Sequence, residues 1–290
     1  MSGRVQGKVA LITGAARGQG RSHALTLARE GADIIAVDIC APIETVTDYP
    51  MPGPEDLAET ARLVEQHDRR CVTRQVDVRE RRDLVDTVAE AVSQLGHLDV
   101  VVANAGIVVN SAEADSITFL DTITVNLNGV INTVRAAMPH LGPGASIVAI
   151  GSFASLVNHG RAATGNPNPG LLGYTHAKRA VARFVHDLAI QAGPGGIRVN
   201  AVHPGNVATD MLLNDALFKV FRPDLDNPTR ADAEPVMAAM HRLPVGLLEP
   251  ADISNAVLYL ASDESRAVTG LQLKVEAGGL LATTTSGAPG

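Results

Sequence analysis

Short apolar segments alternate along this chain with longer segments in which apolar residues recur at helical spacing. The short segments are rich in Val, Ile and Ala, and they have the length of buried strands. We expect strands at residues 9–13, 33–37, 71–76, 98–103, 145–150, 197–202 and 271–275. The longer segments predict helices at residues 20–30, 55–68, 81–95, 119–141, 171–192 and 251–261.

Repeated alternation of strands and helices favours an α/β fold in which helices cover both faces of a parallel sheet. Neither an internal repeat nor a linker-like change of composition interrupts the alternation, so we expect residues 1–290 to form a single domain. Two segments exceed what such a fold requires. Residues 39–54 form a Pro-rich insertion after the second strand, and residues 205–250 form a long irregular segment before the last helix. Long loops in a compact domain are often functional.

Composition and charge narrow the classes of function that fit this chain. With 46% hydrophobic and 19% charged residues, the chain is typical of a soluble globular protein. A net charge of −7 without a basic tract disfavours nucleic-acid binding, and no apolar run is long enough for a membrane span. The N-terminus lacks the apolar core of a secretory signal, and the two cysteines, Cys40 and Cys71, fit a reduced cytoplasmic compartment. The histidines show no metal-like spacing, so we expect no metal site.

A glycine-rich turn at residues 13–20 joins the first expected strand to the first expected helix. Gly14 permits a tight turn, Gly18 lets the backbone approach a pyrophosphate, and Gly20 permits close helix packing. The helix N-terminus would then present free N–H groups and partial positive charge to phosphates. The alternative is an ordinary strand-to-helix turn.

Asp38 ends the second strand and bears on the choice of cofactor. A carboxylate there can accept both hydroxyls of an adenosine ribose and repels a 2′-phosphate, which favours NAD over NADP. Arg17 has the opposite effect, because a cation in the turn can pair with a 2′-phosphate. We give Asp38 the greater weight because it would abut the 2′ position directly. A solvated strand end is the alternative interpretation of Asp38.

Tyr174 and Lys178 are four residues apart, so on a helix both side chains emerge on one face. A phenol with a pKa near ~10 is a poor base at neutral pH, but a nearby cation stabilises the phenolate. Ser152 and Asn126 precede this pair along the chain. Taken singly, Ser152 could end a strand, Asn126 could bend a helix and Tyr174 could pack at a surface.

Together these motifs resemble the short-chain dehydrogenase/reductase family, from residue 8 to about residue 279. The resemblance implies a Rossmann-like, doubly wound parallel sheet of about seven strands and nicotinamide-dependent redox chemistry on alcohols or carbonyls. The matching segments are residues 13–20, 77–78, 104–106, 126–129, 152, 174–178 and 203–205.

The resemblance also implies roles for individual residues. Tyr174, kept ionised by Lys178, would take the hydroxyl proton of an alcohol, and Ser152 would orient the substrate oxygen. Asn126 would hold a water that links Lys178 to solvent. These four residues are the expected catalytic set, and Ser152, Tyr174 and Met211 are the expected substrate contacts. The expected cofactor contacts are Gly14, Arg17, Gly18, Gln19, Gly20, Asp38, Ile39, Asp77, Val78, Asn104, Ala105, Gly106, Tyr174, Lys178, Pro204, Gly205, Val207 and Thr209.

Three features depart from the common pattern of this family. Gln19 stands where a small apolar residue is usual, and residues 157–170 lengthen the segment before Tyr174, where we expect a loop beside the substrate pocket. The insertion at residues 39–54 resembles that of carveol-dehydrogenase-like proteins associated with mycofactocin. That resemblance implies NAD that is covered by the insertion and recycled by an external redox carrier. The alternative is a surface excursion with freely exchanging NAD.

We therefore predict an NAD-dependent enzyme that interconverts a secondary alcohol and a ketone on a mainly apolar substrate, carveol-like or another cyclic alcohol. Two alternatives stay open: a catalytically silent NAD-binding regulator, and an NADPH-linked carbonyl reductase, which Asp38 disfavours. An amphipathic lid would contribute the apolar side chains Met211, Leu212, Leu213, Leu217, Phe218, Val220 and Phe221.

The two long helices at residues 119–141 and 171–192 carry more apolar residues than one buried stripe requires. Members of the family commonly pair the equivalent helices across a two-fold axis, so we predict a homotetramer. The alternative is that these helices are only well packed on their own sheet.

Overall fold

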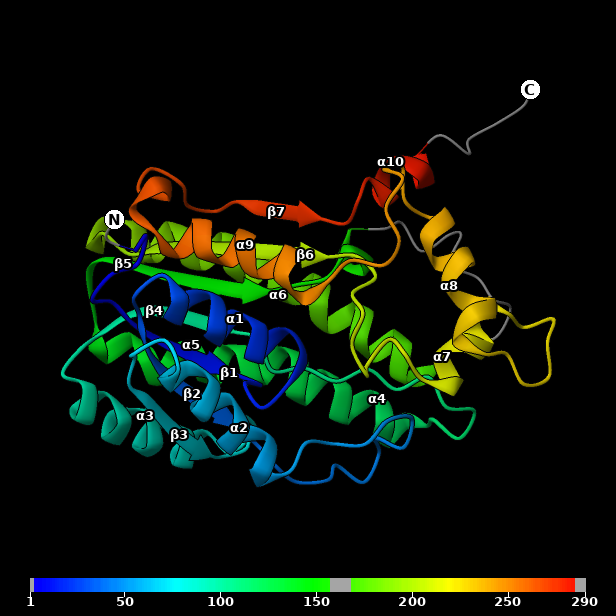
Figure 1. The fold of residues 1–290 in the computed structure, drawn as a ribbon, viewed down its shortest axis with the longest axis horizontal. Coiled ribbons are helices and arrows are strands. Elements are labelled where there is room, and N and C mark those ends of the chain that lie inside the picture. Colours follow the sequence, from blue (N-terminus) through cyan, green and yellow to red (C-terminus); the bar gives the residue numbers. More distant parts are fainter. Residues whose placement is uncertain (1–2, 157–167, 285–290) are drawn as a thin grey trace.

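A computed structural model describes residues 3–156 and 168–284 of the chain (Figure 1). Within these residues, parallel strands form a seven-stranded sheet in the order β3-β2-β1-β4-β5-β6-β7. The predicted α/β fold with a Rossmann-like parallel sheet is thus confirmed. The order reverses beside β1, which is where such sheets bind ligands. The strands are β1 Val9–Thr13, β2 Asp33–Asp38, β3 Cys71–Gln75, β4 Leu98–Ala103, β5 Leu141–Ile150, β6 Arg198–Pro204 and β7 Gln272–Val275.

Helices cover both faces of the sheet and create two cores (Figure 1). Leu11 and Ile35 point into one core, and their chain neighbours Ile12 and Ile34 point into the other. Burial on both faces explains why the strands are nearly continuous apolar runs. One face is covered by α1 Gly18–Arg29, α2 Pro54–Glu65 and α9 Pro250–Ala261, and the other by α3 Arg81–Leu95, α5 Gly129–Ala137 and α6 Pro169–Ala192.

The helix predicted at residues 119–141 is instead a composite. It begins earlier, with α4 Ser116–Ile123, because the Asp115 side chain accepts hydrogen bonds from the N–H groups of the first turn. A π-helical turn, Thr124–Asn128, joins α4 to α5. The helix then tightens into a 3₁₀ turn at Met138–His140, and β5 follows directly.

The segment at residues 205–250 is more ordered than its sequence indicated, because it contains α7 Asp215–Phe221 and α8 Arg230–Ala239. The Asn214 side chain caps α7 by accepting from Leu217 N at 3.0 Å, and a capping box of Thr229 and Asp232 begins α8. Both helices are short and α8 contains Pro235, so neither gives a clear helical period. They lie beyond the carboxyl ends of the strands, and α10 Gly279–Thr284 follows β7 (Figure 1).

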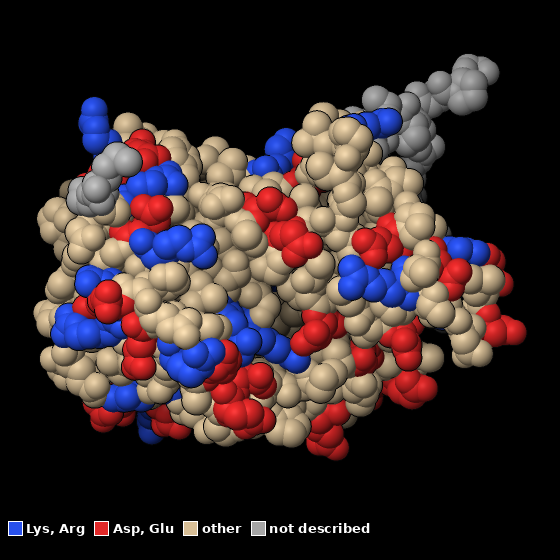
Figure 2. Space-filling model, viewed as in Figure 1, with Lys and Arg blue, Asp and Glu red and all other residues tan. Residues whose placement is uncertain are grey.

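Part of the predicted loop at residues 157–170 lies outside the described residues, because only residues 168–170 belong to them. No helix in the described ranges is both long and apolar enough to cross a membrane. On the face shown in Figure 2, Lys and Arg side chains are interspersed with Asp and Glu.

Candidate active site

A cavity of about 430 Å³ opens at the carboxyl ends of the central strands. Every residue predicted from the sequence to bind cofactor, contact substrate or take part in catalysis lines it. Asn104 follows β4, Ser152 follows β5 and Pro204 ends β6, while Tyr174 and Lys178 enter from α6. Parallel strands therefore bring together motifs that are far apart along the chain.

The glycine-rich turn has the backbone shape that its sequence requires. Gly14 and Gly18 have φ angles of +69° and +55°, which favour glycine. At Gly20, a Cβ atom would lie 1.9 Å from the Gly14 carbonyl oxygen. No side chain caps the start of α1, so the N–H groups of its first turn are free for an anion.

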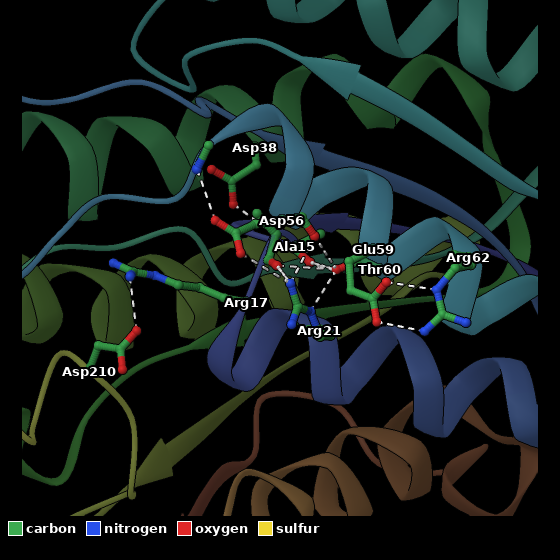
Figure 3. Close-up of polar contacts among 11 residues, drawn as sticks. Ala15, Arg17, Arg21, Asp38, Asp56, Glu59, Thr60, Arg62 and Asp210 are labelled. Atoms are coloured by element: carbon green, nitrogen blue, oxygen red, sulfur yellow. Dashed lines mark hydrogen bonds and ion pairs between the residues drawn. The ribbon is translucent and has the colours of Figure 1, made fainter.

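Two polar side chains hold the outer side of this turn (Figure 3). Thr60 of α2 donates from its hydroxyl to Ala15 O at 3.0 Å. The Arg21 guanidinium donates to Ala16 O and, at 2.8 Å, to Asp56 O. Helix α2 begins at the end of the insertion, so the glycine-rich turn is held by the helix that follows the insertion.

Asp38 is buried at the end of β2. Its carboxylate accepts from Ala16 N at 3.0 Å and from Cys40 N at 3.2 Å. Burial raises the pKa of Asp38, and these hydrogen bonds and the charge of Arg17 act in the opposite direction. In dinucleotide-binding folds, a carboxylate at this position beside the turn binds the hydroxyl groups of a ribose.

Arg17 extends across the cavity toward Asp210, on the segment that follows β6 (Figure 3). Its guanidinium forms an ion pair with Asp210 at 2.9 Å and lies 5.8 Å from the centre of the Tyr49 ring. A Cβ atom on Gly18 would touch Thr209 at 3.4 Å. The turn, the insertion and the segment after β6 thus meet over the expected cofactor side of the cavity.

The expected adenine side is formed by Asp77, Val78 and residues 104–106. Both carboxylate oxygens of Asp77 accept hydrogen bonds from Arg79. The Asn104 amide nitrogen donates to Thr13 O at 2.9 Å, which ties the segment after β4 to the start of the turn. Asn104 therefore has a structural use as well as a place in the cavity wall.

The catalytic candidates are grouped on the expected substrate side. Ser152 and Tyr174 both line the cavity there, and Lys178 Nζ lies 5.7 Å from the centre of the Tyr174 ring. Lys178 is buried and donates to Ile150 O at 2.7 Å. Burial raises the pKa of Tyr174, which the Ser152 side chain counteracts, and burial lowers the pKa of Lys178 to about 8.

Asn126 lies in the π-helical turn and is fully buried. Its amide donates to Ile107 O at 2.7 Å and to Thr122 O at 2.8 Å, so both of its N–H groups are used by the backbone. A π-helical turn within a helix often marks a functional site. The side chain fixes the backbone beside Gly106, where a Cβ atom would lie 2.6 Å from Asn126 Oδ1.

The insertion packs along the cavity wall instead of projecting from the surface. Thr45 donates to the Asp121 carboxylate at 2.8 Å, Asp48 accepts from Asn110 N, and Tyr49 Oη accepts from Val108 N at 3.2 Å. Tyr49 is buried. The side chains that the insertion adds to the lining are Ile39, Ile43, Tyr49, Met51 and Pro52.

Other lining residues lack a motif of their own. Those after β4 and β5 are Ile107, Val108, Asn110, Phe153 and Ala154, and Leu171 lies in the first turn of α6. Leu217, Val220 and Phe221 of α7 face the cavity at spacings of three and four, as the apolar content of the lid indicated. Phe218, also expected in that lid, packs instead against Met237 of α8. Residues 3–156 and 168–284 contain no cluster suited to a metal ion.

A family profile described as enoyl-(acyl carrier protein) reductase matches residues 14–279. Carveol dehydrogenase from Mycobacterium avium, solved with NAD, is 51% identical with a TM-score of 0.89, covering 96% of this chain and 99% of that one. A short-chain dehydrogenase from Mycobacterium paratuberculosis bound to NAD is 39% identical with a TM-score of 0.84, covering 97% and 100%.

Among curated proteins, the (-)-trans-carveol dehydrogenase of Rhodococcus erythropolis is 41% identical over 281 residues, which are 95% of this chain and 98% of that protein. The match therefore spans the turn, the cavity and the lid together. The chain belongs to the short-chain dehydrogenase/reductase family of oxidoreductases.

Proposed function

We propose that this chain interconverts a secondary alcohol and a ketone with NAD, and that Tyr174 is its general acid and base. The family gives the reaction class, and the NAD-bound relatives give the cofactor. The observation that carries the proposal is that Ser152, Tyr174 and the buried ammonium of Lys178 meet in one cavity, where the Ser152 side chain opposes the rise in the pKa of Tyr174. A catalytically silent regulator would have no need for this arrangement.

NAD, when bound, supplies the ring that accepts hydride. In alcohol oxidation, the phenol oxygen of Tyr174 takes the hydroxyl proton of the substrate. Ser152 donates a hydrogen bond to the same substrate oxygen and stabilises the charge that develops there. Lys178, held by the Ile150 carbonyl, favours ionisation of the phenol through its charge.

The residues present fit a dinucleotide. The free N–H groups at the start of α1 suit the pyrophosphate, and the bare backbone at Gly14 and Gly18 allows it to approach. Asp38 would accept the ribose hydroxyls. Because Arg17 is paired with Asp210, it is not free for a 2′-phosphate, which speaks against an NADPH-linked reductase.

The substrate is mainly apolar in this proposal. Leu171, Leu217, Val220 and Phe221 present apolar side chains to the cavity beyond Tyr174, and Met211 joins them. Two relatives are named carveol dehydrogenase. A cyclic secondary alcohol such as carveol satisfies both observations.

The proposal extends to a tightly held NAD that an external redox carrier, such as mycofactocin, reoxidises in place. The contacts of Asp48 and Tyr49 with the cavity wall and of Thr45 with α4 support it, because they make the insertion a fixed cover. The Arg17–Asp210 pair adds a bridge from the turn to the segment after β6. Each contact that must open before release slows dissociation.

We also propose a homotetramer and a cytoplasmic location. Ile117 and Leu120 of α4 are each 60% exposed, and Ile190 of α6 is 66% exposed. Apolar side chains at these positions suit an interface between copies of the chain. The cytoplasmic proposal rests on the two cysteines, both of which are free thiols. Light scattering at micromolar concentration tests the assembly, and a monomeric mass would contradict it.

Tyr174→Phe tests the catalytic proposal. The variant lacks one oxygen and keeps the whole phosphate turn, so it should bind NAD normally and lose about 100-fold or more of its turnover. NADH formation after mixing the NAD-loaded protein with carveol measures turnover. Retention of most of the activity would exclude Tyr174 as the acid and base.

Exchange of labelled NAD tests the proposed retention of the cofactor. The intact protein should purify with NAD, turn over poorly with added NAD alone, and recover with an artificial electron acceptor. Deletion of residues 41–53 should give rapid exchange. Complete exchange into the intact protein within seconds would contradict retention and leave the dehydrogenase proposal unaffected.

A further inference from the structure

His203 is a buried histidine near the end of β6 that the proposed reaction does not use. Its side chain is 0% exposed. Ring atom Nδ1 lies 3.2 Å from Ser152 N and 3.0 Å from Ser152 O, and ring atom Nε2 lies 2.7 Å from Gln272 Oε1. The ring fills the space beside Gly151, where a Cβ atom would come within 2.5 Å of it. The histidine therefore contacts the backbone of the substrate-orienting serine directly.

Gln272 fixes which nitrogen of His203 carries the proton. The Gln272 amide nitrogen donates to Ala182 O on α6 at 3.1 Å, so the amide oxygen faces His203 as an acceptor. Nε2 of His203 must then be the protonated nitrogen. In a neutral imidazole this leaves a lone pair on Nδ1, which accepts the N–H of Ser152.

We propose that His203 and Gln272 are positioning residues that hold Ser152 at the correct place relative to Tyr174. The proposal rests on the role given above to Ser152 and Tyr174. The hydrogen bonds run from Ser152 through His203 and Gln272 to Ala182, which lies on the same helix as Tyr174 and Lys178. This path fixes the serine against the helix that carries its partners.

The position of Ser152 has a second support. Ser155 donates from its hydroxyl to Ser152 O at 2.5 Å, and the same hydroxyl lies 3.0 Å from His203 Nδ1. The serine backbone is thus held at both its N–H and its carbonyl. Misplacement of a substrate-orienting group by about 1 Å can cost ~100-fold in rate, so these bonds bear on kcat.

Protonation of His203 would change this support. An imidazolium carries a proton on Nδ1, which cannot accept the N–H of Ser152 and would instead donate to Ser152 O, 3.0 Å away. In the wild type, burial lowers the pKa of His203, as does the charge of Lys178, while the bonds with Gln272 and Ser152 act in the opposite direction. The charged and polar groups that act on the ring are therefore Lys178, Gln272 and the backbone of Ser152.

Gln272→Glu is the sharpest test. Glutamate keeps an acceptor for Nε2, but its charge stabilises the imidazolium and raises the pKa of His203. We expect kcat of the NAD-loaded enzyme to fall reversibly about 10-fold or more as the pH drops toward 6, with unchanged NAD content. Gln94→Glu adds the same charge on the exposed surface of α3 and should retain the wild-type profile.

Two further measurements make the outcome decisive. His203→Asn offers an amide oxygen to Ser152 N and should retain more kcat than His203→Phe, with similar KM values for both. Nitrogen NMR of the wild-type histidines should show His203 neutral with its proton on Nε2, which requires no variant to fold. A proton on Nδ1 would overturn the proposal.

The inference and the proposed function fail in different ways. If Gln272→Glu follows the wild-type pH profile while Tyr174→Phe is inactive, the positioning role is wrong and the dehydrogenase proposal stands. If Tyr174→Phe is active, the proposed catalysis itself is wrong.

Discussion

In the proposed cofactor half of the cavity the wall is mostly backbone held by hydrogen bonds, whereas in the proposed substrate half it is mostly apolar side chains on short helices and loops. The first half comprises the glycine-rich turn, Asp38 and residues 104–106, and the second comprises Phe153, Leu171 and α7. Backbone walls tolerate few changes because an added atom meets fixed main chain. Side-chain walls can repack, so substrate choice can change while the cofactor site stays constant.

Gly20→Ala should give the largest effect, because it places a new atom against the backbone of the cofactor half. The added Cβ atom would lie 1.9 Å from Gly14 O, and this main chain cannot move without deforming the turn. We expect a loss of stability of about 1–3 kcal/mol and loss of NAD from the purified protein. Gly142→Ala is the matched control, because a Cβ atom there would meet nothing within 4 Å. Normal NAD content in the Gly20→Ala variant would contradict this prediction, because it would show that the turn tolerates an added side-chain atom.

From the titration of Lys178, which lies where the two halves meet, we predict that the reaction rate depends on pH. Burial lowers its pKa from 10.5 to about 8, so its ammonium is present below that pH and is lost as the pH rises through it. The rate of the NAD-loaded enzyme should therefore show an alkaline limb near this value, falling about 10-fold per pH unit above it. Lys178→Arg keeps the charge at all these pH values and should lack the limb. An unchanged limb in Lys178→Arg would assign it to another group.

Asp38→Ala should change the cofactor preference by a smaller amount. The loss of two charge-assisted hydrogen bonds to the ribose should weaken NAD binding by about 10- to 100-fold and relax discrimination against NADP. Because Asp210 holds Arg17, the double variant Asp38→Ala with Asp210→Ala should gain more affinity for NADP than the single variant. Titration of the stripped protein with both cofactors measures this. A wild-type preference for NADP would contradict the interpretation of Asp38.

The residues of the cavity differed in how far the sequence could predict them. The glycines, Asp38 and the Tyr174–Lys178 pair were found because each function depends on local spacing: a turn of fixed shape, a strand end, one helix face. The parallel sheet then brought them to one edge, as expected for such strands. Asn126 was found as a candidate, but its π-helical turn was not, since no local signal distinguishes that turn from an α-helix.

Several residues around the cavity escaped prediction for a physical reason. Tyr49 and Asn110 enter the wall through contacts between segments about sixty residues apart, which no local pattern encodes. His203 was included in the matching segment 203–205 and judged to lack metal spacing, but its bonds to Ser152, after β5, and to Gln272, on β7, were not predicted. The short helices α7 and α8 depend on caps at Asn214 and Thr229 more than on periodicity. Tertiary contacts determine the positions of these residues.

Val220→Ala should give the smallest effect and most directly probes the tolerance of the substrate wall. Val220 lines the cavity from α7 and is only partly buried, so its truncation removes a few apolar contacts with the substrate and leaves Ser152 and Tyr174 in place. Each lost methylene contributes about 0.8 kcal/mol, so KM for an apolar alcohol should rise by roughly 5- to 15-fold with kcat nearly constant. Lys219→Ala on the exposed side of the same helix is the control and should leave both constants unchanged. A fall in kcat with constant KM would mean that α7 takes part in the chemistry itself, and the division between a rigid cofactor half and an adaptable substrate half would have to be redrawn.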